Sequence, residues 1–419
     1  MRHRLSLLVM LACAALLAVF AAGASSAAAD TTQLTVIGPW QGQDAASFNA
    51  VLAGFTASHP GTSITYKPVS GDVAAALPGS DADLAVLSLP ADQDAMATMY
   101  RDGTIKSLDF AVPTLNANYR WSWKLLGSTD GVLTGLFFKA TDLSAFWYDE
   151  AAFKSLGLTP PTTWAGLQRV AAKIRAAGLT PYAVSGDSAF ALPNLFQNVY
   201  LQFEGNRNYD RLASGALSWH DSTVTGSLGV LRGMLSNSVY GGTAGLSQSY
   251  AQAVRDVFGS PMKAYMVPGG SAVLPVLASS QADRPLSQFG VFSFPKLKKT
   301  SAPNVVGDAD AVVMAKGSDT ARSLIQYLAT PAAAAIWAQR GGDFISPNQA
   351  VPASAYRVPQ MATLARAVAS ANAFRFPLAD AKPAPFRQTL GAQLARYLSS
   401  PTQVGDVVAR IAVAAGEKK

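Results

Sequence analysis

Two short aromatic runs in the middle of the chain limit its possible folds more than any other feature. Residues 136–138 read Leu-Phe-Phe, and residues 146–148 read Phe-Trp-Tyr after a polar break. Runs of this length and composition are typical of strands. An amphipathic helix follows from Thr163, and Gly178 can end it. Two strands side by side at mid-chain could join two lobes, although the stretch alone also suits a buried strand–turn–helix unit of any α/β enzyme.

The segment after residue 30 alternates between the patterns of strands and helices. Apolar strands are predicted at 34–37, 64–67 and 84–87, and a helix over 48–55 carries apolar residues at i, i+3, i+4 and i+7. This β-α-β-α-β order predicts an α/β fold with a parallel, doubly wound sheet.

Polar side chains follow two of these predicted strands. Trp40, Gln41 and Asp44 come after the first strand, and Ser88 comes after the third. Ligands of such sheets bind beyond the carboxyl ends of the strands. These four residues are therefore candidates for ligand contact.

Length and composition suit two folded domains. The chain has 419 residues, of which 49% are hydrophobic and 14% charged, so it can bury large cores. The net charge of +7 comes from scattered cations, with one tight cluster at Lys296, Lys298 and Lys299. A solvated loop explains this cluster better than nucleic-acid binding does, so we expect no nucleic-acid partner.

The first 29 residues have the pattern of a secretory signal peptide. Arg2 and Arg4 form a basic start, residues 7–20 an apolar core, and the small residues before Asp30 a cleavage site. We expect cleavage after residue 29 and an extracytoplasmic mature protein. A lipid anchor at Cys13 and an uncleaved leader are the alternatives. No later segment is long and apolar enough to span a bilayer.

Cysteine and histidine are scarce in this chain. Cys13 is the only cysteine and lies within the predicted leader, as does His3. The two other histidines, His59 and His220, are expected at helix ends or on the surface. The mature protein is therefore expected to have no disulfide, no cysteine nucleophile, no metal site and no cofactor.

Several motifs resemble one protein family, and they do so in order along the chain. Residues 135–164, including Phe-Trp-Tyr-Asp and Pro-Pro-Thr-Thr-Trp, resemble the crossover segment of extracellular solute-binding proteins of sugar ABC importers, the maltose-binding-protein-like group. Lys139 lies where that family often has proline. Residues 321–352 are similar to α-glucoside-type members, with Trp337, a Gly-Gly pair and Phe-Ile-Ser-Pro-Asn. In residues 374–380, Arg375, Phe376 and Asp380 match a later motif, whereas Pro377 and Ala379 depart from it.

The resemblance implies a two-lobed, class II periplasmic-binding-protein-like α/β fold with a ligand cleft between the lobes. Lobe 1 would comprise residues 30–139 plus 301–345, and lobe 2 residues 140–300 plus 346–419. Crossovers near 138–145, 295–305 and 346–352 would form the hinge. The implied function is capture of a sugar or short oligosaccharide, with an α-glucoside as one candidate, and its delivery to a membrane ABC permease. The protein would act as a monomer and would not alter its solute.

The resemblance also implies which residues contact a sugar. Trp40 would stack on a sugar ring unless it faces the core. Helix caps explain Asp187 and Asn194 as well as ligand contact does, and a plain turn explains Gly270 and Ser271. The further candidates are Lys139, Asp187, Phe190, Asn194, Gly270, Ser271, Asp308, Asp310, Arg340, Phe344 and Arg375.

Two other functions remain open from the sequence. A secreted glycoside hydrolase needs only two carboxylates, and Asp187 and Asp308 could supply them. Against a hydrolase of another kind, the chain has no Gly-x-Ser-x-Gly elbow and no histidine placed with a nucleophile. Asp308 and Asp310 alone offer too few oxygens for a metal. A non-transport sugar sensor is the other possibility.

Overall fold

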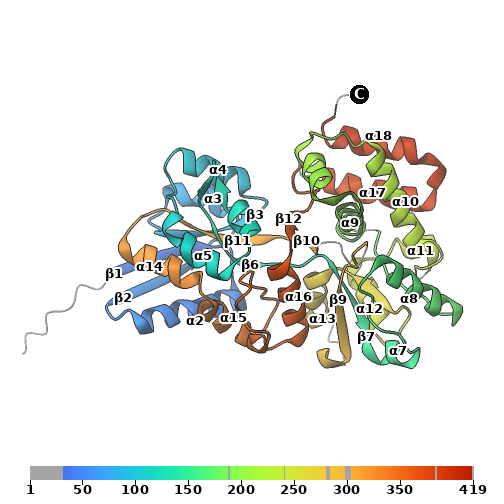
Figure 1. Cartoon of the computed structure of the whole chain (residues 1–419), viewed down its shortest axis with the longest axis horizontal. Coiled ribbons are helices and arrows are strands. Elements are labelled where there is room, and N and C mark those ends of the chain that lie inside the picture. The colour runs from blue at the N-terminus through green and yellow to red at the C-terminus, as the bar shows by residue number, and fades with distance from the viewer. Residues whose placement is uncertain are drawn as a thin grey trace, which may run out of the picture.

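A five-stranded sheet forms the centre of the first of two lobes (Figure 1). The computed structural model describes residues 32–186, 189–239, 241–279, 284–297, 303–382 and 385–417. The strand order is β2-β1-β3-β11-β6, and β1 runs parallel to both β2 and β3, which confirms the parallel start of the sheet. β11 runs antiparallel to both β3 and β6, because the chain returns from the second lobe into this sheet. The strands are β1 (Thr32–Gly38), β2 (Thr62–Pro68), β3 (Leu84–Leu89), β6 (Leu136–Ala140) and β11 (Ala309–Met314).

Helices from residues 42–126 and 319–340 cover the first sheet. α2 (Gly42–Ser58) buries the apolar stripe predicted from the sequence, including Phe48 and Phe55, and packs against α15 (Pro331–Arg340). Helix α15 begins at Pro331, and the Thr330 side chain accepts a hydrogen bond from the Ala333 backbone N–H. The other helices of this lobe are α3 (Val73–Ala76), α4 (Gln93–Arg101), α5 (Val112–Asn118), α6 (Trp121–Leu126) and α14 (Asp319–Leu328).

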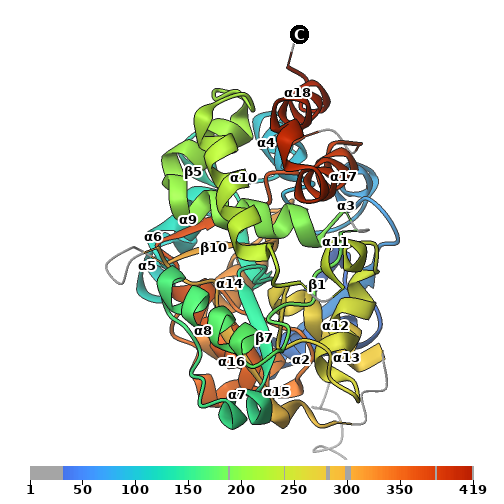
Figure 2. The same ribbon diagram turned by 90° about the vertical axis from the view of Figure 1, so that its right-hand side faces the viewer.

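The second lobe has a smaller antiparallel sheet and more helix. Its strand order is β8-β7-β9, and α9, α10 and α17 lie together on one side of the lobe (Figure 2). The aromatic rings of Phe196, Trp219 and Phe386 pack together between these helices. The elements are β7 (Ala145–Asp149), α7 (Glu150–Ser155), α8 (Trp164–Ala176), α9 (Ala191–Ser214), α10 (Ser222–Leu235), α11 (Gly242–Gly245), α12 (Tyr250–Phe258), β8 (Met266–Pro268), η3 (Gly270–Ala272), α13 (Val273–Ser279), β9 (Phe289–Ser293), α16 (Pro359–Ser370), α17 (Pro385–Ser399) and α18 (Val404–Ala414). None of the helices within the described ranges combines the length and hydropathy needed to cross a membrane.

The two aromatic runs are strands, as predicted, but they are not neighbours in one sheet. β6 is an edge strand of the first sheet, and β7 is the central strand of the second. Only residues 141–144 separate them, so this short crossover joins the lobes. The separation follows from packing, because each aromatic run is buried in the core of its own lobe.

The first crossover is hydrogen-bonded to segments of both lobes. The backbone N–H of Leu143 donates to Val306 O at 2.8 Å, which places the crossover beside β10 (Asn304–Val306). β10 pairs in parallel with β12 (Ala373–Arg375). The Ser271 backbone N–H donates to Asp142 O at 2.7 Å from the η3 turn. The crossover is therefore a largely buried, hydrogen-bonded segment rather than a free linker.

Gly270 allows the close approach of η3 to this crossover. Its φ is +54°, and an added Cβ would lie 1.8 Å from Asp142 O. Its own carbonyl accepts a hydrogen bond from Trp147 Nε1 at 2.7 Å. Only glycine fits here without moving the backbone of the crossover.

We expect Gly270→Ala to lower the free energy of unfolding by about 2 kcal/mol or more, since the methyl group must displace the Asp142 carbonyl. Urea denaturation followed by circular dichroism measures this loss. Gly229→Ala is the matched control, because Gly229 lies exposed in α10 with nothing within 4 Å of the added Cβ. The control should gain about 0.5–1 kcal/mol. Equal stability of the two variants would contradict the close approach at Gly270.

Candidate functional site

Two adjoining cavities lie where the lobes face each other. The larger has a volume of about 810 Å³, and the smaller about 90 Å³. Both are lined by Pro377 and Asp380, so they are parts of one cleft. Lobe 1 contributes the segment after β3 and the turn before β11, and lobe 2 contributes α9, α17 and the segment between β12 and α17. The polar residues that line the cleft are Gln93, Asp94, Asn194, Gln197, Tyr209, Asp210, Ser214, Asp308, Arg375, Asp380, Lys382 and Arg387.

Asp308 is the carboxylate best placed to receive a ligand in this cleft. It lines the smaller cavity, and its backbone N–H donates to Thr141 Oγ1 at 2.8 Å. Within the described part of the chain, no hydrogen bond reaches its carboxylate. Burial raises the pKa of Asp308 to about 6, although the Arg387 guanidinium acts in the opposite direction. Above that pH the ionised group can accept hydrogen bonds from two hydroxyls.

The smaller cavity is also lined by an ion pair that was not among the predicted site residues. Arg387, near the start of α17, pairs with Asp380. Asp380 was expected only as part of a motif, and Arg387 was not a predicted site residue. No local pattern marks Arg387, because its position depends on how α17 packs against the turn at Pro377.

The lobe 1 side of the cleft begins where β3 ends. Asp92 accepts a hydrogen bond from the Ser88 backbone N–H at 2.8 Å, and burial raises its pKa. The exposed Gln41 donates to Ser70 Oγ at 3.4 Å. Ser88 lies within β3, one residue before its end, and Asp92 follows the strand, so the rule that selected Ser88 could have found Asp92 as well.

Trp40 lies in the core of lobe 1 and not on an exposed surface. Its ring is 4% exposed and packs edge-on against Phe48 and Trp337, with centroids 4.7 and 4.9 Å away. Its Nε1 donates to Asp310 Oδ2 at 2.8 Å, and Ser88 Oγ donates to the other oxygen at 3.0 Å. Trp40 therefore faces the core, which was the alternative to sugar stacking. Asp310 and Ser88 are hydrogen-bonded to groups of the same lobe. Burial raises the pKa of Asp310.

Lys139 forms the centre of a second internal cluster. Its Nζ lies 2.6 Å from Asp44 Oδ2 and 3.1 Å from Asp343 Oδ1. Burial alone would lower the pKa of Lys139, but the two carboxylates outweigh it and raise the pKa. Phe344 stacks on Trp337 with centroids 4.9 Å apart, and Lys139 Nζ lies 5.5 Å from the Trp337 ring.

Arg340 is the remaining candidate of lobe 1. It is exposed, and its Nε donates to Ser47 Oγ at 3.2 Å. Ser47 belongs to α2, so this contact joins the end of α15 to α2. Neither cavity of the cleft has Arg340 in its lining.

The structure gives the lobe 2 candidates separate roles. Asn194 is buried and donates to Leu143 O at 2.9 Å, which ties α9 to the crossover. Phe190 lines the smaller cavity, edge-on to Tyr250 at 5.0 Å. Arg375 lines the larger cavity and pairs with Asp210 through both Nε and an Nη.

Two of the three remaining lobe 2 candidates, Ser271 and Gly270, contact the crossover. Ser271 and Gly270 hold Asp142 in the crossover. Asp187 lies outside the described residues. Within those residues, no three His, Cys, Asp or Glu side chains gather so that they could hold a metal ion.

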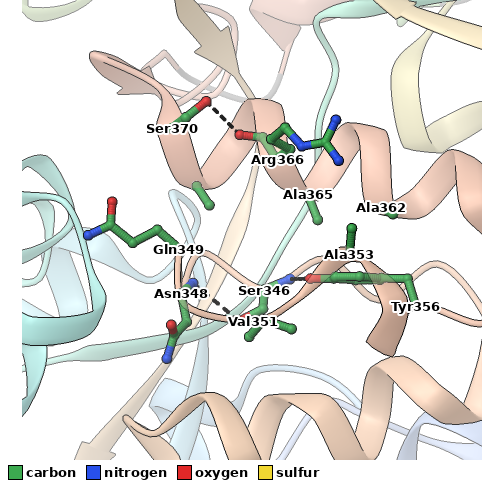
Figure 3. A pocket seen from close by; sticks show the side chains of 11 residues that line it. Ser346, Asn348, Gln349, Val351, Ala353, Tyr356, Ala362, Ala365, Arg366 and Ser370 are labelled. Carbon is green, nitrogen blue, oxygen red and sulfur yellow. Dashed lines mark hydrogen bonds between the residues drawn. The ribbon is translucent and has the colours of Figure 1, made fainter.

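A third cavity, of about 130 Å³, lies away from this cleft, beside the predicted third crossover (Figure 3). Its polar groups bond mostly to one another. The Ser346 backbone N–H donates to Tyr356 Oη at 3.2 Å, and the Asn348 N–H donates to Ser346 Oγ at 3.2 Å. Asn348 Nδ2 donates to Ala329 O at 3.1 Å. The Ser-Pro-Asn motif therefore anchors this segment to the end of α14.

We expect Lys139→Met to lower the free energy of unfolding by about 2 kcal/mol, because Asp44 and Asp343 would lose the cation between them. Urea denaturation at pH 7 measures the loss. Lys67→Met is the control, since Lys67 and Asp81 form an exposed pair at 3.3 Å, and it should change stability little. A Lys139 variant as stable as the control would mean that water solvates the two carboxylates well enough without the lysine.

Comparisons with known proteins agree with the geometry. Residues 39–335 match the family described as bacterial extracellular solute-binding protein. The osmoprotective compounds-binding protein GgtB of Synechocystis is 24% identical over 84% of this chain and 85% of its own length. The alpha-glucosides-binding periplasmic protein AglE of Rhizobium meliloti is 25% identical over 84% of this chain and 80% of its own.

Solved structures share the fold as well. The bacterial solute receptor AcbH superposes with a TM-score of 0.79 at 16% identity, covering 92% of this chain and 99% of that one. The two-lobed α/β fold is the one shared with this solved structure, and the family match extends over well more than half of the residues. The chain belongs to the bacterial extracellular solute-binding protein family.

Proposed function

We propose that this protein captures a sugar or short oligosaccharide in the interlobe cleft and delivers it unchanged to a membrane ABC permease. The observation that carries the proposal is the Asp308 carboxylate, which accepts no hydrogen bond from the described residues and lines the smaller cavity together with the Asp380–Arg387 pair. Sugars offer many hydroxyls, and carboxylates and guanidinium groups bind hydroxyls through charge-assisted hydrogen bonds.

The names of the relatives support a sugar-like solute. AglE is named for alpha-glucosides and GgtB for osmoprotective compounds, and the AcbH structure is described with a preference for β-D-galactopyranose. Two of these names refer to sugars, and polar side chains line the cleft of this chain. An α-glucoside is the first candidate to test.

Delivery requires that the lobes close around the solute and open again. We propose lobe 1 as residues 30–139 plus 301–345 and lobe 2 as 140–300 plus 346–419, with the three crossovers as the hinge. Hinge closure of this kind buries a ligand between two nearly rigid bodies. We further propose that residues 1–29 direct export and are removed, and that the protein works as an extracytoplasmic monomer beside the permease.

We expect the melting temperature of the mature protein to rise with one class of sugar in a panel of mono- and oligosaccharides. Binding to the folded state at a concentration of 100 Kd stabilises it by about 2.7 kcal/mol. Differential scanning fluorimetry measures the shift, and chromatography of the recovered sugar checks that it is unchanged. A panel without any shift would contradict a sugar as the solute, and released monosaccharide would favour a hydrolase.

Asp308→Asn should weaken binding of the active sugar by about tenfold or more, because a neutral amide loses a charge-assisted acceptor. Its unfolding free energy above pH 6 should not fall, since ionising the buried Asp308 opposes folding there. Wild-type affinity should decrease as the pH drops through about 6, where the carboxylate takes up a proton.

Isothermal titration calorimetry from pH 5 to 8 measures both effects. Asp81→Asn is the control, because Asp81 is exposed and lies before the amino end of β3, whereas the cleft lies beyond the carboxyl end of that strand. Equal affinity of the Asp308 variant and the wild type would remove Asp308 from the binding site.

A further inference from the structure

The short crossover between the lobes changes partners within two residues. Thr141 bonds to the turn before β11 in both directions: its backbone N–H donates to Asp308 O and its Oγ1 accepts from the Asp308 N–H, each at 2.8 Å. Asp142 bonds to lobe 2, where its carbonyl accepts from the Ser271 N–H at 2.7 Å and its N–H donates to Ser271 Oγ at 3.2 Å. The next residue, Leu143, donates its backbone N–H to Val306 O, so the crossover is bonded to both lobes on either side of Asp142, and a change in the angle between the lobes would act on this residue.

The side chain of Asp142 is buried at this step. The residue has no exposed surface, and its Oδ1 accepts from the Ser144 N–H at 2.6 Å. Its Oδ2 has no hydrogen-bond partner in the described part of the chain. A buried carboxylate oxygen without a partner is costly, because it has lost water and gained nothing.

The elements packed around Asp142 present uncharged polar groups. η3 presents Ser271, α9 presents Asn194 and Asn198, and the crossover itself presents Ser144. Leu143, the next residue, lines the smaller cavity. The ionisable side chains of that cavity are Asp308, Asp380 and Arg387, and these are the ones that face this region. Arg387 pairs with Asp380, and among the described residues no cation forms an ion pair with Asp142.

The protonation state of Asp142 therefore changes the energy of the packed crossover. Burial raises the pKa of Asp142 to about 7, so both states are populated near neutral pH. The neutral acid needs no counter-charge and carries an O–H that can donate. In the ionised form, one charged oxygen is neither solvated nor hydrogen-bonded. Looser packing between the lobes would let water reach this oxygen.

We propose that Asp142 is a proton-operated control of hinge closure, which makes solute affinity depend on pH through a residue that does not touch the solute. The proposal rests on the proposed capture of a solute by closure of the lobes. Protonation favours the tightly packed crossover and hence closure, and ionisation favours opening. Asp308 acts with the opposite sign, because its ionised form binds the solute.

Stability without solute tests the control first. A raised pKa in the folded state means that the contribution of Asp142 to stability is lost as the pH rises through about 7. Between pH 6 and 8 the wild-type melting temperature should therefore fall by on the order of 2 °C relative to Asp142→Asn, whose amide mimics the neutral acid. Parallel profiles of the two proteins would overturn the proposal.

Asp256→Asn provides the matched control. Asp256 is also buried and its Oδ2 also lacks a partner among the described residues, but its Oδ1 lies 3.1 Å from Lys263 Nζ and it is in lobe 2 away from the crossover. Because a cation compensates its charge, this variant should keep the wild-type pH profile. A profile that matches Asp142→Asn instead would show that any buried carboxylate produces the effect, which contradicts a hinge control.

Small-angle X-ray scattering of the wild type keeps the test independent of how the variants fold. Without solute, the radius of gyration should be larger at pH 8 than at pH 6, and an invariant radius would overturn the proposal. With the active sugar, wild-type affinity should peak between about pH 6 and 7, where Asp308 is ionised and Asp142 is still largely neutral. In Asp142→Asn, the affinity should no longer decrease above about pH 7, but it should still decrease below about pH 6. If no sugar binds at any pH, the proposed function fails, whereas the solute-free profiles still decide the role of Asp142.

Discussion

The pair of hydrogen bonds between Thr141 and Asp308 joins the two features on which a binding protein of this kind depends. Asp308 supplies a free carboxylate to the cleft, and its backbone is bonded in both directions to the crossover between the lobes. Gly307 makes this possible, because a Cβ there would lie 2.1 Å from Thr141 O. The residue that presents this carboxylate is therefore hydrogen-bonded directly to the crossover between the lobes.

Most polar residues at the cleft edge of the first sheet serve the lobe itself. Lys139 compensates Asp44 and Asp343, and Asp310 accepts from Trp40 and Ser88. Buried charges and donors must find partners, so a residue type suited to ligand binding is equally suited to bracing the fold. What distinguishes Asp308 from Asp310, two residues away, is that no protein group in the described chain satisfies its carboxylate. Lys139 occupies the position where the family often has proline. Its ammonium group pairs with Asp44 and Asp343, which a proline side chain could not do.

The sequence predicted the elements better than their arrangement. The strands at the start of the chain, the α2 stripe, the two aromatic runs and the two-lobed fold are all present, because periodicity and strand-like composition are local properties. The expectation that the two aromatic runs form strands side by side was wrong, because they lie in separate sheets and strand pairing depends on residues far away in the chain. Within the cleft, Asp308 was named and lies in the cleft lining, whereas Arg387 was missed and Trp40 proved to be a core residue.

The sequence by itself determined the family, the α/β class and the positions of the segments that follow strands. Motif order and the spacing of apolar residues can be read along the chain without knowing which distant segments come together. Only the tertiary structure decided which polar side chains are free. Asp44, Asp308 and Asp310 are alike as residues, yet one pairs with a lysine, one is open to a cavity and one is bonded to an indole. The physical reason is that satisfaction of a carboxylate depends on donors contributed by other strands and helices, and these meet it only when the chain is folded.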